Sequence, residues 1–143
     1  MTPVTVSLKD VRLTLPSLAG RVEILRGAEF TANRGEAVGI VGPSGSGKTT
    51  LLMVIAGLEQ ASSGSVEVAG IKLNGQSEDE LAVFRRDNIG IVFQSFHLIP
   101  TMTALENVAV PLEFAGRRDA FDRAGAALAA VGLAHRLGHY PGQ

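Results

Sequence analysis

The chain has 143 residues and a net charge of −1, which is enough length for one domain with its own core. Its 45% hydrophobic and 19% charged residues exclude an intrinsically disordered protein, and the balanced charge predicts no nucleic-acid partner. The absence of cysteine excludes disulfides, thiolate catalysis and cysteine metal sites. The sequence starts without a basic and apolar leader and has no apolar run of membrane-spanning length. We therefore expect a chain that is soluble or is held at a membrane by a partner.

Short apolar segments near the start of the chain predict strands. Loose alternation over residues 4–15 predicts the first strand, and the segments 22–25 and 30–32 predict two more. Turns are predicted at 18–20 and 33–35, where small and polar residues gather. Because several short strands precede the first helix, we expect an antiparallel sheet that leads into a parallel one.

A glycine-rich loop follows an apolar strand predicted at 37–41 and precedes a helix predicted at 50–56, which ends at Gly57. The loop spells G-x-x-x-x-G-K-[ST], the phosphate-binding motif. Its glycines let backbone N–H groups turn toward phosphates, and the helix adds its positive end. Lys48 can reach the β- and γ-phosphates, and the hydroxyl of Thr49 can ligate Mg²⁺. The predicted nucleotide-binding residues are Gly42, Pro43, Ser44, Gly45, Ser46, Gly47, Lys48, Thr49 and Thr50.

The simpler interpretation of this loop is a glycine-rich turn between two core elements. The strand–loop–helix order on both sides of the motif favours the phosphate-binding interpretation instead.

A hairpin and a capped helix follow. Strands are predicted at 65–69 and 71–73, separated by a glycine. Ser77 and Glu80 have the spacing of a capping box, which predicts a helix that extends to about Arg86.

Helices dominate after a second apolar strand, which is predicted at 89–93. The pattern Thr103-x-x-Glu106 is another capping box, and its helix is expected to kink or restart at Pro111. The alanine-rich segment 118–131 predicts a last helix. Its expected apolar stripe consists of Phe121, Ala124, Leu128 and Val131.

This order of phosphate loop, hairpin, helix, apolar strand and Gln94 resembles the ATP-binding subunit of ABC transporters. The loop 42–50 matches the phosphate loop of that family, and Gln94 matches its Q-loop glutamine. The implied role of this glutamine is to touch Mg²⁺ and the attacking water and to sense the membrane partner. The stretch 92–108 resembles the branch that serves lipoprotein release and macrolide-type export.

The resemblance covers essentially the whole chain and implies an α/β fold: a P-loop NTPase core with an N-terminal antiparallel β subdomain and the start of an α-helical subdomain. It implies one ABC-type ATP-binding domain, incomplete over 1–143. The β subdomain and P-loop core would occupy 1–93, and the Q-loop and helical subdomain 94–143. The family's Ser-Gly-Gly motif, Walker B acidic pair and switch histidine would lie further on. We therefore expect the front part of a longer subunit, without catalytic residues of its own.

The resemblance also implies cofactors, partners and a location. ATP and Mg²⁺ would bind, with Thr49 and Gln94 as predicted metal ligands. The partners would be an integral membrane permease and a second ATP-binding subunit in a homodimer, on the cytoplasmic face of the cell membrane. The family's adenine-stacking aromatic residue is replaced, and the best matches are Leu15 and Val22.

Two questions stay open at this point. Phe96, Leu98 and Ile99 follow Gln94 and would either be buried between the subdomains or form a groove for a helix of the membrane subunit.

The function could be that of an ABC-type ATPase, of a nucleotide-binding fragment without turnover, or of another P-loop enzyme such as a small-molecule kinase. A kinase would need an acceptor pocket and an arginine-bearing lid, for which the segment after Gln94 gives no sign. A polypeptide of residues 1–143 alone is expected not to hydrolyse ATP.

Overall fold

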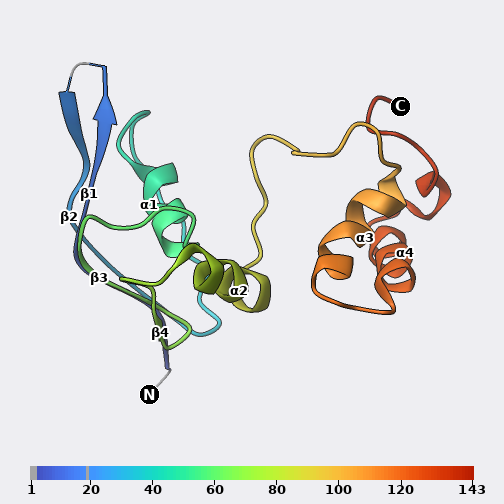
Figure 1. Ribbon diagram of the computed structural model, residues 1–143. Helices are drawn as coiled ribbons and strands as arrows, with labels where there is room; N and C mark the ends of the chain where they lie inside the picture. The colour runs from blue at the N-terminus through green and yellow to red at the C-terminus, as the bar shows by residue number, and fades with distance from the viewer. Residues whose placement is uncertain (1–2, 19) are drawn as a thin grey trace. The chain divides into compact units, whose positions relative to one another are not determined.

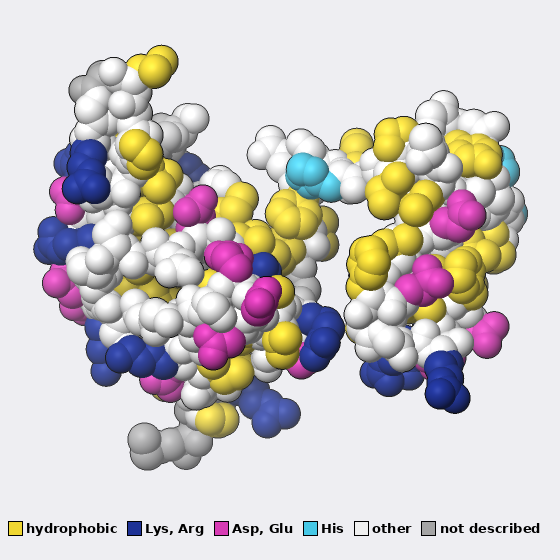
Figure 2. Space-filling view, in the orientation of Figure 1, with side chains coloured by type: hydrophobic (Ala, Val, Ile, Leu, Met, Phe, Trp, Pro, Cys, Tyr) yellow, Lys and Arg dark blue, Asp and Glu magenta, His cyan; other side chains and the backbone are white. Residues whose placement is uncertain are grey.

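The computed structural model describes residues 3–18 and 20–143, so the turn predicted at 18–20 lies partly outside the described residues. Contacts divide the chain into two compact units, Met1–Ile91 and Val92–Gln143. No helix in the described part of the chain is long and apolar enough to cross a membrane. On the face shown in Figure 2, the surface of the first unit carries both basic and acidic side chains.

The first unit is built on one antiparallel sheet with the strand order β2-β1-β3-β4 (Figure 1). The predicted antiparallel sheet is therefore confirmed. Its strands are β1 (Val4–Ser17), β2 (Gly20–Asn33), β3 (Ser63–Val68) and β4 (Ile71–Lys72).

The two strands predicted at 22–25 and 30–32 are a single strand, β2. The register between β1 and β2 shifts near Asp10 and Gly27, both of which have positive φ. Gly27 has φ 85°, a backbone conformation that favours glycine opposite this bulge, and a Cβ atom there would also push aside the carboxylate of Asp10. The alternation of apolar residues is interrupted between the two predicted segments, so the sequence pattern alone predicts two strands. The register shifts allow β1 and β2 to stay paired through this interruption, so β2 is one continuous strand.

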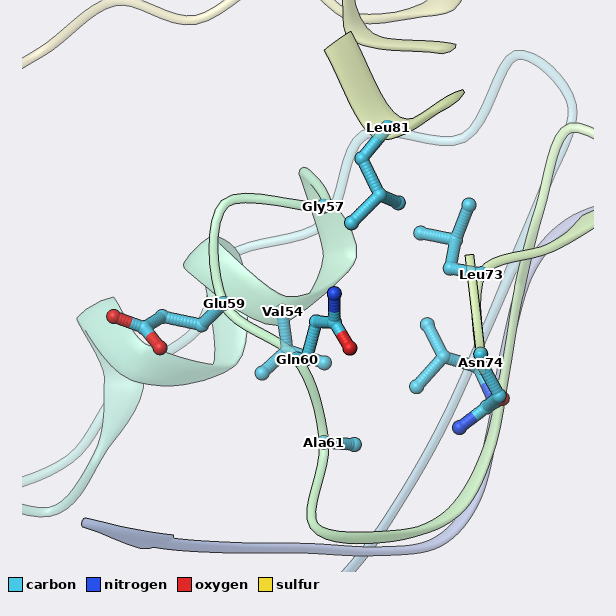
Figure 3. Close-up of a pocket in the computed structure, with 10 residues that line it drawn as sticks. Val54, Gly57, Glu59, Gln60, Ala61, Leu73, Asn74 and Leu81 are labelled. Atoms are coloured by element: carbon cyan, nitrogen blue, oxygen red, sulfur yellow. The ribbon is translucent and has the colours of Figure 1, made fainter. Parts of the chain in front are cut away.

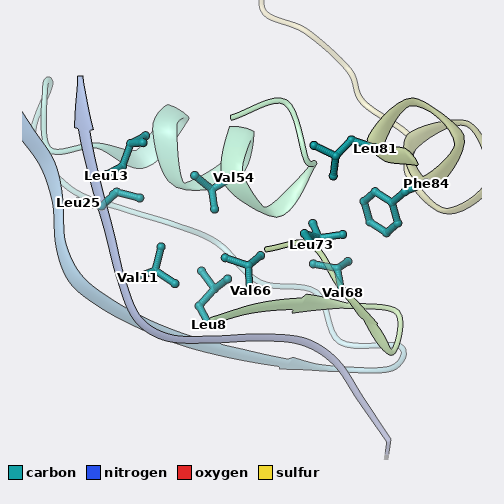
Figure 4. Packing of buried hydrophobic residues seen from close by; sticks show 10 residues of the cluster. All are labelled: Leu8, Val11, Leu13, Leu25, Val54, Val66, Val68, Leu73, Leu81 and Phe84. Carbon is teal, nitrogen blue, oxygen red and sulfur yellow. The ribbon is translucent and has the colours of Figure 1, made fainter. Parts of the chain in front are cut away.

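One face of the sheet packs against α1 (Lys48–Ile55) and α2 (Glu78–Asn88), which lie on the same side of it (Figure 4). Both helices begin and end close to where the sequence predicts them. The buried cluster between sheet and helices consists of Leu8, Val11, Leu13, Leu25, Val54, Val66, Val68, Leu73, Leu81 and Phe84.

The strands predicted at 37–41 and 89–93 are not formed, and this part of the prediction is wrong for the described residues. Val41 is 92% exposed and Val92 is fully exposed, although an apolar central strand would be covered on both faces. The physical reason is pairing. A strand needs a neighbour to take its backbone hydrogen bonds, and the only sheet in the described residues pairs β1 to β4 with one another.

The second unit consists of α3 (Ala104–Phe114), α4 (Ala120–Ala130) and the short helix η1 (Ala134–Arg136). Pro111 lies inside α3, which continues for three more residues, so the predicted restart does not occur. In α4 the buried side chains are Ala120, Ala124 and Leu128, whereas Phe121 and Val131 are exposed. Ala124 and Leu128 are therefore buried as predicted, and the stripe is rotated so that Ala120 replaces Phe121 and Val131 on the buried face.

The first turn of α3 is completed by a distant part of the chain. The N–H groups of Ala104 and Leu105 donate to the carbonyl oxygens of His139 and Leu137, at 2.8 Å and 3.0 Å. These donors have no acceptor within the helix itself. The end of the second unit thus hydrogen-bonds to its beginning.

Both predicted capping boxes are confirmed. Ser77 Oγ accepts from the Glu80 N–H, and Glu80 Oε2 accepts from the Ser77 N–H at 2.8 Å. Thr103 and Glu106 form the same pair of bonds at the start of α3. The backbone and hydroxyl hydrogen bonds from Ser77 lower the pKa of Glu80, and those from Thr103 lower the pKa of Glu106.

Because the pKa values of Glu80 and Glu106 are lowered in the folded protein, part of the free energy of unfolding depends on pH in the acid range. The stabilisation is complete above the ordinary glutamate pKa of about 4.3 and is lost as the pH falls through the lower folded-state pKa. We expect the double variant Glu80→Gln with Glu106→Gln to be less stable than the parent at pH 7, and the difference to shrink below about pH 4. Urea unfolding at several pH values measures this. Glu113→Gln removes an exposed charge outside both capping boxes and should leave the pH dependence of stability unchanged. An effect equal to that of the double variant would refute the assignment.

Candidate functional site

The site begins with the loop that leads into α1. Gly47 is the N-cap of α1 and has a left-handed backbone, with φ 90°. A Cβ atom at this position would lie 3.3 Å from the carbonyl oxygen of Ile24 on β2, and also 3.3 Å from a methyl group of Leu25. The backbone conformation favours glycine, and a Cβ atom in this close approach would require the neighbouring atoms to move by a few tenths of an ångström. The end of the loop is therefore held directly against strand β2.

The N-terminus of α1 differs from those of α2 and α3 in what surrounds it. No side chain caps α1, and its first turn contains no acidic residue. In contrast, α2 and α3 each have a capping box and acidic residues in the first turn. The first N–H groups of a helix lack acceptors within the helix, and the helix dipole is positive at this end. The start of α1 is therefore suited to bind an anion from solution.

Lys48 is the first residue of α1, and its half-buried side chain folds back over the loop. Its Nζ donates to the carbonyl oxygens of Gly42 at 2.9 Å and Pro43 at 2.7 Å, and lies 3.5 Å from Ser46 Oγ. The neighbouring Thr49 is exposed. A cation, a hydroxyl and a free helix end thus lie together on the surface, as the motif predicts.

An open cleft surrounds this loop and contains all the predicted phosphate-binding residues. One wall is the segment 40–51, which includes the whole motif, and the other is the segment 22–28 of β2. The loop side contributes backbone and hydroxyl groups. The β2 side contributes apolar residues together with the charged residues Glu23 and Arg26. The cleft lies entirely within the first unit.

The two residues predicted to contact adenine are neighbours in space. Leu15 and Val22 are cross-strand partners of β1 and β2. Val22 is 47% exposed and lines the cleft, whereas Leu15 packs on the edge of the core. Val22 is thus the better placed of the two to cover a base, and its role stays a prediction.

The remaining predicted site residues belong to the second unit. Gln94 is exposed, and so are Phe96, Leu98 and Ile99 within their own unit. Because Thr49 and Gln94 lie in different units, their pairing as Mg²⁺ ligands stays a prediction. No cluster of three or more His, Cys, Asp or Glu residues that could hold a metal occurs in the described parts of the chain.

Two features of the site region are not foreseen from the sequence. The first is the wall of the cleft formed by residues 22–28 of β2. Its position beside the loop depends on the pairing of β1 with β2, and no local sequence motif predicts it. The second is Asn107, whose Oδ1 accepts from the Ile99 N–H at 2.7 Å, while its Nδ2 donates to the carbonyls of Ile99, Met102 and Thr103. One side chain thereby fixes the turn that follows the exposed apolar residues.

A second, smaller cavity lies behind α1 and is separate from the site. Its volume is about 20 Å³, which is room for about one water molecule. Val54 and Leu81 point toward it from the two helices, and Gln60 and Asn74 add polar atoms (Figure 3). Its size and partly apolar lining suit a buried water rather than a nucleotide.

Comparison with known proteins agrees with the geometry. The family model described as "ABC transporter" matches residues 25–142. The lipoprotein-releasing system ATP-binding protein LolD 1 of Rhodospirillum rubrum is 44% identical over 124 residues, covering 85% of this chain and 55% of that protein. The macrolide export ATP-binding/permease protein MacB of Rhodopseudomonas palustris is 40% identical over 141 residues, covering 97% of this chain and 22% of that protein.

A solved structure shares the fold as well. It is described as the dimeric structure of a post-hydrolysis state of the ATP-binding cassette MJ0796 bound to ADP and Pi. It is 40% identical with a TM-score of 0.87, over 96% of this chain and 62% of that chain. The chain thus spans about half the length of LolD 1, about a fifth of MacB and less than two thirds of the solved cassette. The predicted fold class is confirmed as that of the N-terminal region of an ABC ATPase.

The phosphate loop before an uncapped helix, the cleft beside the antiparallel sheet and the family match over residues 25–142 agree with one another. The chain belongs to the ABC transporter family, and it is similar to members of the LolD and MacB type.

Proposed function

We propose that the chain binds ATP in the cleft between the loop 42–50 and β2, as part of a transporter that uses ATP hydrolysis for export or lipoprotein release. The observation that supports this most strongly is the start of α1, which has no side-chain cap and no acidic residue and has Lys48 beside it. The names of the relatives, a lipoprotein-releasing protein and a macrolide exporter, support the transport process.

In this proposal the protein mainly positions the nucleotide. The β- and γ-phosphates would lie at the N-terminus of α1, where backbone N–H groups and Lys48 neutralise their charge. Val22 would cover the base at the other end of the cleft. The hydroxyl of Thr49 and the amide oxygen of Gln94 are hard oxygen donors, the type that Mg²⁺ prefers. When bound, Mg²⁺ neutralises phosphate oxygens during in-line attack by water.

The proposed partners are a second ATP-binding subunit and an integral membrane permease, at the cytoplasmic face of the membrane. The dimeric form of the solved cassette supports the homodimer. The permease relation is supported by the name of MacB, in which ATP-binding and permease parts belong to one protein. The exposed side chains of Phe96, Leu98 and Ile99 are the proposed contact with the permease, since Asn107 holds the turn after them in place.

The metal role of Thr49 can be separated from the phosphate contact. We expect Thr49→Val, which keeps the side-chain shape, to reduce the benefit of Mg²⁺ for ATP binding while leaving metal-free affinity nearly unchanged. Isothermal titration with ATP, in the presence of Mg²⁺ and of a chelator, measures both. Thr5→Val on β1 is the control for the loss of a threonine hydroxyl. If the parent binds no ATP under either condition, the proposed function is wrong; equal Mg²⁺ dependence in Thr49→Val and the parent would exclude only the metal role.

The proposed docking residues can be tested in the complete transporter. We expect Phe96→Asp to reduce co-purification of the ATP-binding subunit with its permease and to leave ATP affinity unchanged, because a charge in an apolar contact costs desolvation. Phe121→Asp places the same charge on an exposed aromatic residue of α4 and should retain the complex. Normal co-purification of a folded Phe96→Asp variant would exclude this surface.

A further inference from the structure

Helix α1, which begins at the proposed phosphate site, is held at both of its ends. It has eight residues, and Val54 is its buried side chain. At its beginning, Gly47 approaches β2 closely. Beyond its other end, Gly57 meets α2: a Cβ atom at Gly57 would lie 3.4 Å from side-chain carbons of Leu81 and Phe84, and Leu81 lies beside it in Figure 3. The position of α1 therefore depends in part on α2.

Arg85 of α2 adds a hydrogen bond to this junction. Its guanidinium group donates to the carbonyl oxygen of Gly57, and its Nη2 lies 3.8 Å from Oε2 of Glu78. The Arg85 side chain is 23% exposed, so salt and solvent screen its charge less than they screen a fully exposed one. Helix α1 has no basic residue in its own last turn, although a helix is negative at this end and favours a cation there. Arg85 therefore supplies, from α2, the cation that α1 itself lacks.

We infer that Arg85 is a positioning residue for the phosphate site at the opposite end of α1. This inference rests on the proposed function, because it assumes that phosphates bind where α1 begins. The free N–H groups at the start of α1 point along the helix axis, so a tilt of the helix changes where they meet an anion. A short helix moves as one rigid element, and a tilt at one end therefore reaches the other. By fixing Gly57 to α2, Arg85 keeps these N–H groups in place at the cleft beside β2.

A role in stability alone makes a different prediction. If Arg85 only strengthened the junction, its loss would lower the free energy of unfolding and leave the phosphate site of the folded protein unchanged. If Arg85 positions α1, its loss should also shift the amide signals of residues 47–50 and weaken ATP binding by the folded protein. Arg86 provides the matched control, because it is the next residue of α2 and its half-exposed guanidinium group pairs with Asp87 at 2.7 Å instead of with α1.

The experiment compares Arg85→Met with Arg86→Met, which remove the same charge. Amide ¹H–¹⁵N spectra recorded without added nucleotide report on the start of α1, and isothermal titration with Mg·ATP gives the affinity. In Arg85→Met we expect shifted signals at 47–50 and an ATP affinity about two- to thirtyfold weaker, the range found for coupling through packed elements. Arg86→Met should leave both at parent values. Arg85→Lys keeps a cationic donor and should restore most of the affinity and of the amide positions. If Arg85→Met does not fold, Arg85→Gln, which is uncharged and shorter, replaces it with the same expectation.

Parent-like amide signals at 47–50, or parent-like ATP affinity, in a folded Arg85→Met or Arg85→Gln variant would overturn the inference. Equal changes in Arg86→Met would attribute the effect to the lost charge and would also overturn it, as would the absence of rescue by Arg85→Lys. If the parent itself binds no ATP, the proposed function is wrong, and the amide signals alone then decide whether Arg85 positions the start of α1.

Discussion

Replacing Lys48 by alanine should weaken Mg·ATP binding about ten- to a hundredfold. The lysine is expected to donate charge-assisted hydrogen bonds to the phosphates, and such bonds contribute about 1.5–3 kcal/mol. Part of this gain is offset in the parent, because Nζ must first leave the carbonyls of Gly42 and Pro43. The loss in Lys48→Ala should nevertheless be large, because Lys48 is the one cationic side chain in the loop sequence 42–50. Isothermal titration with Mg·ATP measures the change.

The control for charge is Lys72→Ala, which removes an exposed lysine from β4 and has the same effect on net charge. Its ATP affinity should stay within about twofold of the parent, because screening makes distant surface charges weak. Circular dichroism and thermal unfolding must show that the Lys48→Ala variant is folded. Parent-like affinity in a folded Lys48→Ala variant would exclude the loop 42–50 as the phosphate site.

Replacing Leu81 by alanine should reduce the free energy of unfolding by about 2–5 kcal/mol. Leu81 is 1% exposed and belongs to the cluster that joins α2 to α1 and the sheet (Figure 4). It also lines the small cavity behind α1, so the removed methyl groups would enlarge a void that already exists (Figure 3). Residual void volume adds to the lost transfer energy in such variants. Urea unfolding of the parent and the variant, with the same slope, measures the difference.

Val83→Ala is the matched control on the same helix, because Val83 is 49% exposed. We expect a change of about 0.5 kcal/mol or less from it, as for most surface substitutions. A loss of stability in Leu81→Ala no larger than in Val83→Ala would show that α2 does not pack on the core in solution.

Local signals predicted the parts of the structure that local chemistry determines. Ser77 with Glu80, and Thr103 with Glu106, place two helix starts correctly, because a capping box satisfies backbone groups within four residues. The phosphate loop and the start of α1 are likewise contained in one contiguous motif. The family resemblance, based on the motif and Gln94, is confirmed by the family model over residues 25–142.

Features that depend on distant partners could not be predicted. The segments 37–41 and 89–93 have the composition of buried strands, yet composition does not supply the neighbouring strand that they need. The wall of the cleft formed by 22–28 depends on bulges at Asp10 and Gly27, whose positions are set by strand register. The side chain of Asn107 hydrogen-bonds to the backbone of Ile99 in the turn at 99–103, and no periodic pattern in the sequence predicts this contact.

The hydrogen bonds from the first turn of α3 to the carbonyls of Leu137 and His139 have a consequence for folding during synthesis. A ribosome adds about 5–20 residues per second, so α3 emerges seconds before its acceptors exist. Until then its first amides depend on water, and the apolar side of α3 has no α4 to cover it. The contact between the ends of the second unit is non-local, and closing it is slower than forming either helix. During translation there is therefore a period in which the apolar side of α3 is exposed to solvent. In this period the second unit offers a chaperone more apolar surface than it does once α4 is present.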